Sequence, residues 1–319
     1  MGFSMLDQLA FSVSVTGPIC LMLGLGVFLK RMHILNEGFI DTGSKLVFKV
    51  TLPALLFLSI IQSEYDLANN LPFVMYGLAA NFAFFIITVI STKIFFPSSN
   101  DQGVIIQGGF RANTSIIGLA YAANLYGEQG VASAALYVAA TTVLYNILAV
   151  IALSPTQQSS QLKVLTMIGK TITKNPLIIA ISLGFIFYGL SVPIPQIVAH
   201  AGKYFADMTL PLALLCTGAS LNLRSLQQEK NSAWFATTLK LVFCPLVIVG
   251  GGFLMGYRGL ELGLLFTMTA SPTAAASYVM ARSMGGNPTL AANVIALTTV
   301  VSLLTGSLGI AFLSSFHLI

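Results

Sequence analysis

Charged residues are scarce in this chain of 319 residues. Asp, Glu, Lys and Arg together make up 8% of it, whereas soluble domains carry about 25%. So few charges cannot cover a water-soluble globule of this length. The scarcity therefore excludes a soluble protein, although the length alone would allow one or two soluble domains.

Cysteine and histidine are also rare, with three residues of each type. Cys20, Cys216 and Cys244 all lie in apolar runs, which excludes a disulfide framework. Neither residue type shows the spacing of metal ligands, and no phosphate-binding loop of the P-loop kind occurs. We therefore expect no metal, no cofactor and no catalytic residues, so the sequence does not predict an enzyme.

Two further absences narrow the class of partner. The net charge of +5 comes from basic residues scattered singly between hydrophobic stretches, which provides no binding surface for a nucleic acid. The first residues, MGFSMLDQLAF, contain no basic region and no small-residue cleavage site. We therefore expect no removable signal peptide.

Apolar residues dominate the composition. They make up 56% of the chain, and the mean hydropathy is +0.87. About 20 apolar residues cross the bilayer core as a helix, and intervals of that size fill nearly the whole sequence. We predict an all-α polytopic protein of the lipid bilayer with ten transmembrane helices. Their approximate ranges are 8–29, 38–62, 68–96, 102–126, 129–153, 175–192, 196–222, 231–256, 259–284 and 287–315.

The basic residues predict which side of the membrane each loop faces. Nine fall in the loops after helices 1, 3, 5, 7 and 9, whereas only Lys203 and Arg258 fall on the opposite side, together with acidic residues. Since basic loops stay in the cytoplasm, both termini of this cell (inner) membrane protein are expected to be extracellular or periplasmic. The nine are Lys30, Arg31, Lys93, Lys163, Lys170, Lys174, Arg224, Lys230 and Arg282.

The sequence matches itself at an offset of 158 residues. Lys45 then falls on Lys203, and the Thr-Leu-Pro triplet at 51–53 falls on the same triplet at 209–211. Each half holds five predicted helices, an odd number, so the second half enters the membrane from the opposite side. Such a 5+5 inverted repeat is typical of transporters that bind substrate at the midplane between their halves.

The repeat divides the chain into three parts. Residues 1–153 form the first five-helix repeat, and residues 175–319 form the second, inverted one. Residues 154–174 between them are expected to be a cytoplasmic linker.

Helix 4 contains a charged residue deep in the membrane. Arg111 follows two glycines and lies ten residues, about 15 Å of helical rise, beyond Asp101. An arginine at this depth is costly unless it faces a polar cavity or a partner, and it marks a functional site by default. Arg111 is therefore predicted to neutralise an anionic substrate, or alternatively to hold the fold by pairing with carbonyls at a helix end.

Helix 9 contains a matching break. Pro272 removes a backbone donor and disrupts the turn before it, and the offset of 158 places 111–115 on 269–273. Two broken helices at equivalent positions are the best pointer in a sequence to a transport site. The candidate substrate-binding residues are Arg111, Asn113, Thr114, Ser115, Thr269, Ser271, Pro272 and Thr273, with Lys240 as a ninth.

Lys240 lies ten residues beyond Lys230, again roughly 15 Å deep. Three roles stay open for it: a positive charge opposite the substrate, a replacement for the cation that other carriers bind, or a side chain that snorkels to the surface. Pro53 and Pro211 also lie within predicted helices, and we expect each of them to kink its helix.

Three segments carry a resemblance to a known family. RANTSIIGL in helix 4, TLPLALLCTGASL in helix 7 and SPTAAASYVMARSMGGNPTLAANVIALTTVVSLLT near the end are similar to the auxin efflux carrier family, which includes plant PIN-type exporters and bacterial malonate-transporter-like carriers. The chain lacks the long central loop of many plant members, so it resembles a bacterial-type member. Of the prolines at the plant crossover, only Pro272 has a clear counterpart here.

This resemblance has consequences for architecture. It implies that helices 4 and 9 are broken and cross each other. They would belong to a transport domain of helices 3–5 and 8–10, which moves against a scaffold of helices 1, 2, 6 and 7. It also implies a homodimer built through the scaffold helices.

Residues and resemblance together predict a secondary active transporter that works by elevator-type alternating access. The substrate is expected to be a small organic anion, either a mono- or dicarboxylate or an auxin-like acid. Arg111 would neutralise the carboxylate, the polar residues of both breaks would line the cavity, and Pro272 would fix the second break. Two alternatives stay open: a sodium-coupled symporter of the bile-acid type, which shares this architecture, and an anion channel.

The distribution of basic residues generates a topology prediction. Reporter fusions at Ile319 and within 154–161 should report opposite sides of the membrane, because nine basic residues against two place the termini outside. A reporter enzyme that is active only in the periplasm measures this directly. Fusions that report the same side would contradict the ten-helix inverted arrangement.

Overall fold

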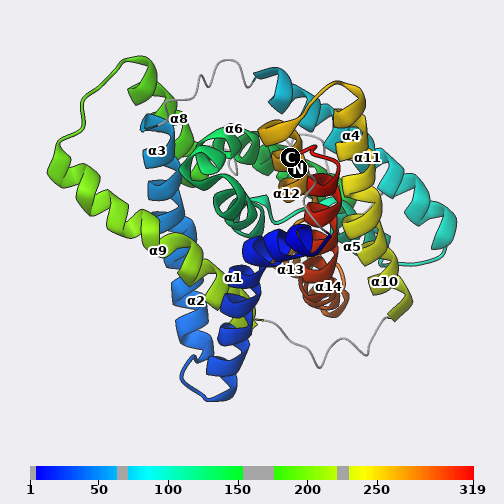
Figure 1. The fold of residues 1–319 in the computed structure, drawn as a ribbon. Coiled ribbons are helices and arrows are strands. Elements are labelled where there is room, and N and C mark those ends of the chain that lie inside the picture. Colours follow the sequence, from blue (N-terminus) through cyan, green and yellow to red (C-terminus); the bar gives the residue numbers. More distant parts are fainter. Residues whose placement is uncertain (1–4, 63–70, 154–175, 221–229) are drawn as a thin grey trace.

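The computed structural model describes residues 5–62, 71–153, 176–220 and 230–319 of the chain. Within these ranges the protein is all-helical (Figure 1), apart from an isolated antiparallel bridge between Ala112 and Thr273. The predicted cytoplasmic linker, residues 154–174, lies outside the described residues.

Helix occupies each of the ten ranges predicted from the sequence, with bounds that agree within a few residues. The first half contains α1 (Met5–Arg31), α2 (Glu37–Leu46), η1 (Val47–Thr51), α3 (Leu52–Ile61), α4 (Leu71–Phe95), α5 (Gln102–Phe110), η3 (Thr114–Gly118) and α6 (Leu119–Leu153). The second half contains α8 (Pro176–Gly189), α9 (Gln196–Ser220), α10 (Lys230–Thr238), η5 (Leu239–Phe243), α11 (Cys244–Leu254), α12 (Gly259–Ala270), α13 (Ala276–Ser283) and α14 (Pro288–Ser315). The η segments are π-helical turns.

Several helices are long and apolar enough to cross a bilayer. Five such stretches occur in the described part of the chain, and α8 and α12 are shorter apolar helices. One of the five runs through η3 and α6, but Gly127 interrupts it with φ 59° and ψ −146°. Gly127 lies between the predicted helices 4 (102–126) and 5 (129–153). The number of membrane crossings stays a prediction.

Two of the π-helical turns have a local cause in proline. η1 directly precedes the turn that contains Pro53, and η5 directly precedes the turn that contains Pro245. A proline has no N–H to donate to the carbonyl four residues earlier, and its ring crowds that carbonyl. Widening the turn before it accommodates both effects. Pro211, in contrast, lies inside the continuous helix α9.

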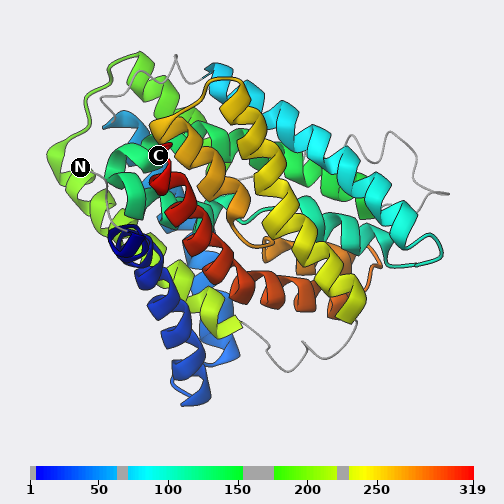
Figure 2. The same cartoon turned by 45° about the vertical axis from the view of Figure 1, so that its right-hand side comes forward.

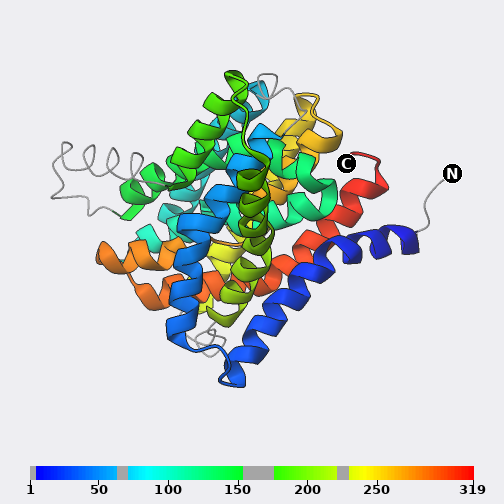
Figure 3. The same ribbon diagram turned by 90° about the vertical axis from the view of Figure 1, so that its left-hand side faces the viewer.

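The helices pack in two groups. One, the α9 group, consists of α1, α2, α3, α8 and α9, which contact one another and lie at the left and bottom of Figure 1. The other, the α5 group, consists of α4 to α6 and α10 to α14. Figure 2 shows α4 beside α11 in the α5 group, and Figure 3 shows α3 and α9 crossing in front of it. Contacts of α6 with α3 and of α1 with α14 join the groups.

Large apolar side chains line the outer face of α14. Leu304, Leu308 and Phe312 are 69%, 64% and 60% exposed. Their spacing of four residues places them on one face of the helix. An exposed apolar stripe of this kind marks a surface for lipid or for another protein, and it agrees with the low charge of the chain.

Helices α1 and α9 approach until their backbones touch. A Cβ atom added to Gly26 would lie 2.2 Å from the Leu215 carbonyl oxygen, and one added to Gly218 would lie 2.1 Å from the Leu23 carbonyl oxygen. Real Cβ atoms do not come this close to backbone, so only glycine fits at either position. The contact is a small-residue helix interface of the kind common in membrane proteins.

This interface generates a stability prediction. Gly26→Ala should destabilise the protein by about 1–3 kcal/mol, because the added methyl group forces the two helices apart. Gly24→Ala on the same helix is the control, since nothing lies within 4 Å of its Cβ position. Thermal unfolding of the purified variants in detergent measures the difference. Equal melting temperatures for the two variants would contradict the close contact.

Candidate functional site

Both predicted helix breaks occur, and they lie against each other. α5 ends at Phe110 and helix resumes at Thr114, whereas α12 ends at Ala270 and α13 begins at Ala276. Each helix is followed by an extended residue, Arg111 with φ −79° and ψ 101° and Ser271 with φ −63° and ψ 148°. Each break frees donors and acceptors that need partners at membrane depth.

The two breaks supply those partners to each other. The Asn113 N–H donates to the Pro272 carbonyl at 2.7 Å, and the Ala274 N–H donates to the Arg111 carbonyl at 3.1 Å. These bonds flank the isolated antiparallel bridge. Pro272 contributes only its carbonyl, so its missing N–H leaves no donor unsatisfied. The segments that break helices 4 and 9 therefore pair where they cross.

Hydroxyl groups of the second break also bond to carbonyls. Those of Thr269 and Ser271 donate within their own helix at 2.6 and 2.7 Å, whereas that of Thr273 donates to the Gly108 carbonyl of α5 at 2.7 Å. All three side chains are at most 1% exposed. In this conformation the Thr273 hydroxyl bonds across the crossing, and the other two hydroxyls bond to carbonyls near the end of α12.

Polar side chains of the first break are similarly enclosed. Asn113 and Thr114 are buried, and Ser115 is half-buried. The Asn113 carbonyl accepts from the Gly118 N–H at 3.0 Å, which starts the helix after the break. The predicted residues of both breaks therefore come together around one crossing point.

Arg111 is 6% exposed and directs its guanidinium between α6 and α13. Its Nη2 donates to Asn146 Oδ1 at 2.7 Å, and its Nη1 contacts Met280 Sδ. No ion pair in the described part of the chain includes Arg111. A buried guanidinium with only neutral partners keeps its full positive charge available to a ligand.

Lys240 lies on the η5 turn and is fully buried. Its Nζ donates to the Thr269 carbonyl, near the end of α12, and lies 3.7 Å from Cys244 Sγ. The carbonyl end of a helix carries partial negative charge, which an ammonium group stabilises. Of the three roles left open for Lys240, snorkelling is wrong, because the side chain does not reach a surface.

A buried polar network holds α4 against α6 behind the crossing. Asn81 Nδ2 donates to Tyr137 Oη at 2.9 Å, and Tyr145 Oη donates to Asn81 Oδ1 at 2.7 Å. The Tyr145 ring packs edge-on against Phe110, the last residue of α5, with centroids 5.8 Å apart. This network fixes the helix end from which Arg111 projects.

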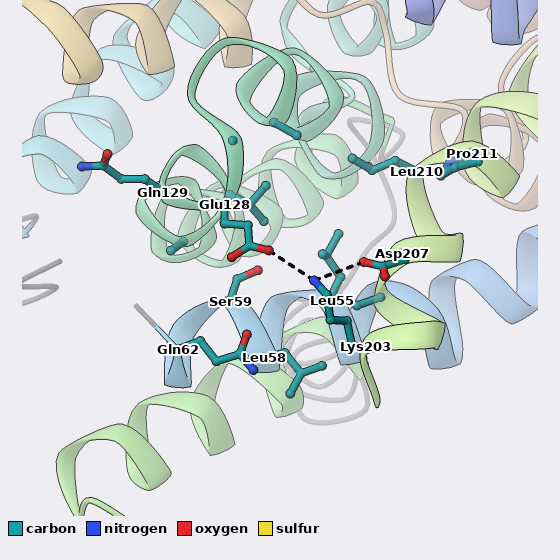
Figure 4. A pocket seen from close by; sticks show the side chains of 15 residues that line it. Leu55, Leu58, Ser59, Gln62, Glu128, Gln129, Lys203, Asp207, Leu210 and Pro211 are labelled. Carbon is teal, nitrogen blue, oxygen red and sulfur yellow. Dashed lines mark hydrogen bonds and ion pairs between the residues drawn. The ribbon is translucent and has the colours of Figure 1, made fainter. Parts of the chain in front are cut away.

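A cavity of about 840 Å³ lies between the two helix groups (Figure 4). Its lining residues include Leu55 of α3 and Gln62 directly after it, Glu128 of α6, and Lys203 and Pro211 of α9. None of the nine predicted site residues lines it. The cavity lies toward the Gly127 end of α6, whereas the Arg111 guanidinium lies toward α13.

Two ion pairs at this cavity involve Lys203. Its Nζ lies 3.2 Å from Glu128 Oε1 and 3.6 Å from Asp207 Oδ1 (Figure 4). Glu128 belongs to the α5 group and Lys203 to the α9 group, so the first pair bridges the groups. The side chains are 52%, 84% and 61% exposed for Lys203, Glu128 and Asp207. Exposed pairs of this kind contribute about 0–1 kcal/mol.

Sequence reasoning missed the partners of Arg111. Asn146 is the single asparagine within the predicted span 129–153, and an amide so deep in an apolar run is a signal that could have found it. Met280 gave no such signal, because methionine is ordinary in an apolar helix.

Comparisons with known proteins identify relatives of the whole chain. Residues 13–310 match the family described as membrane transport protein. A protein of Methanothermobacter thermautotrophicus described as an uncharacterized transporter is 23% identical over 285 residues, which cover 88% of this chain and 91% of that protein. An uncharacterized transporter of Methanocaldococcus jannaschii is 25% identical over 294 residues, which cover 90% and 94%.

Proposed function

Because the chain belongs to the membrane transport protein family, the family of the auxin efflux carriers that its motifs resemble, we propose that this membrane transporter is a secondary active carrier of a small organic anion. One observation carries the proposal. Two interrupted helices pair at their breaks, and a buried arginine without a carboxylate partner in the described residues lies beside the pairing.

The charge at the crossing supports an anionic substrate. Arg111 and Lys240 are both buried there, and their hydrogen-bond partners are neutral. Helix also begins at the crossing twice, at η3 and at α13, and helix N-termini attract negative charge. A mono- or dicarboxylate or an auxin-like acid supplies the compensating charge, with its carboxylate on the planar fork of Arg111.

Matching element bounds support an inverted repeat. Adding the offset of 158 to the bounds of α5 gives 260–268, and α12 runs over Gly259–Ala270. The same sum for α4 gives 229–253, and α10, η5 and α11 together cover 230–254. Gly127 falls on Gly285, and both have positive φ, 59° and 78°. We propose that the two halves are five-helix repeats of opposite orientation.

The two helix groups support an elevator mechanism. The α9 group corresponds to the scaffold helices 1, 2, 6 and 7, and the α5 group, which carries both breaks, corresponds to the transport domain. The cavity and the Glu128–Lys203 pair lie between them. In this proposal the α5 group moves along α3 and α9, and the scaffold also forms the contact of a homodimer.

Arg111→Ala should reduce anion uptake at least tenfold, because it removes the charge that pairs with the substrate carboxylate. Arg111→Lys should recover little, since an ammonium group offers no planar fork. Uptake of radiolabelled mono- and dicarboxylates into proteoliposomes measures this, with Arg31→Ala, at the exposed end of α1, as the control. Full transport by a folded Arg111→Ala protein would remove Arg111 from the mechanism.

A cross-link between the helix groups should stop transport if they move past each other. The experiment introduces Glu128→Cys and Lys203→Cys into a protein whose three native cysteines are replaced, and it joins them with a short thiol cross-linker. Lys203→Cys with Asp207→Cys is the control, because both positions lie on α9. Uptake should vanish only in the first pair and return after a cleavable linker is reduced. Undiminished uptake by the cross-linked first pair would contradict the elevator.

Transport should be insensitive to replacement of Na⁺ by K⁺ or choline. The Thr269 carbonyl is already bound by the Lys240 ammonium, and two buried positive charges repel a cation at the crossing. Uptake under clamped membrane potential tests this. A steep, saturable Na⁺ dependence that disappears in Thr269→Ala or Ser271→Ala would favour the bile-acid-type symporter. Large unitary currents that follow the anion gradient would instead favour a channel.

A further inference from the structure

Three polar side chains, Gln107 and Arg111 from the end of α5 and Asn146 from α6, meet Met280 of α13 at one place beside the crossing. Gln107 lies one turn before Arg111 on α5, and Asn146 lies on α6. Both Arg111 Nη1 and Gln107 Nε2 are directed at the same atom of α13, the Met280 Sδ, which lies 3.8 Å from Gln107 Nε2.

A thioether is a poor partner for these groups. Its sulfur is a weak acceptor, yet a charged guanidinium nitrogen and an amide nitrogen are both directed at it. Buried donors of this kind are normally matched by oxygen acceptors. The two donors around the sulfur therefore suit an oxygen acceptor better than the thioether that lies there.

Two further polar atoms near this place have no hydrogen-bond partner among the described residues. Gln107 is fully buried, and its Oε1 accepts no hydrogen bond. The Ser277 Oγ lies one turn before Met280 on α13 and also has no hydrogen-bond partner among the described residues, and its side chain is 2% exposed. An unsatisfied buried polar atom is unfavourable and needs an explanation. A ligand that binds beside Gln107 Oε1 and Ser277 Oγ would explain why both atoms lack partners here.

We propose that Met280 fills the anion-binding site in this conformation, and that an oxygen of the substrate takes the place of its sulfur during transport. The site consists of Arg111 Nη1 and Gln107 Nε2, with Asn146 holding the other end of the guanidinium. This proposal rests on the proposed function, because it names the site at which the carried anion binds. It adds Gln107 and Met280 to the residues that determine affinity.

The chemistry of each group fits this exchange. A carboxylate presents two oxygens with about four acceptor positions, so it accepts from both donors and can accept more. Hydrogen bonds between charged partners are roughly twice as strong as neutral ones, which favours the carboxylate over the thioether. Met280 is half-buried and unbranched, so it can turn away without disturbing the backbone of α13. The closed site therefore opens by a side-chain movement.

The test measures the dissociation constant of a panel of mono- and dicarboxylates on the purified full-length protein by calorimetry. Met280→Ala should bind the preferred anion about fivefold more tightly, because the competing side chain is gone. Met280→Leu provides a second variant that keeps the volume and lacks the sulfur acceptor, and it should also bind more tightly. Met284→Ala, at the half-buried residue that follows α13, is the control and should leave the constant unchanged.

Met280→Glu gives the opposite result, because it attaches a carboxylate to the chain at the place of the sulfur. It should abolish binding of added anion while the melting temperature stays at or above that of the original protein. Gln107→Leu should weaken binding at least fivefold. Unchanged or weaker binding by both Met280→Ala and Met280→Leu, or normal binding by Met280→Glu, would overturn the inference.

The outcomes separate the inference from the function on which it rests. If the original protein binds an anion and Arg111→Ala loses it, but the Met280 variants behave like the control, only the inference fails. If the original protein binds no member of the panel, or Arg111→Ala binds as well as the original, the proposed function fails and the inference with it.

Discussion

A helix that breaks inside a bilayer leaves N–H and carbonyl groups for which lipid offers no partners. In this protein two helices are interrupted at the same place, and each supplies hydrogen-bond partners to the other. The bonds run from the Asn113 N–H to the Pro272 carbonyl and from the Ala274 N–H to the Arg111 carbonyl. Each break thus supplies hydrogen-bond partners that the other needs. The need for mutual pairing fixes how α5, α6, α12 and α13 meet, and through them it fixes where every polar group of the site lies.

The two buried positive charges are also satisfied by neutral hydrogen-bond partners. Arg111 and Lys240 lie on opposite elements near the crossing, and each is bonded to neutral oxygen atoms instead of a carboxylate. The Lys240 ammonium is bound to the carbonyl end of α12. Arg111 differs, since a thioether occupies one end of its guanidinium. The two buried cations thus differ in the quality of their acceptors.

Much of the fold was predictable because it follows from local physics. Hydropathy located the helices, and the depth of Arg111 and the proline at 272 located the two breaks within a few residues. The deep amide of Asn146 marks a polar position, but its pairing with Arg111, and that of Met280, was not predictable, since the two residues lie 35 and 169 residues away from Arg111 in the chain. Nothing in a local window encodes such distant contacts. The cavity was missed for the same reason, because its walls come from α3, α6 and α9.

The exposed pair of Glu128 and Lys203 adds little to the packing that holds the two helix groups together. A surface ion pair contributes at most about 1 kcal/mol, which changes a ratio of two populations by only about fivefold. Screening by salt at physiological strength reduces it further. The bond that visibly joins the two helix groups is therefore a weak bias and not a lock. In the elevator proposed above, breaking this pair would add little to the cost of moving one helix group past the other.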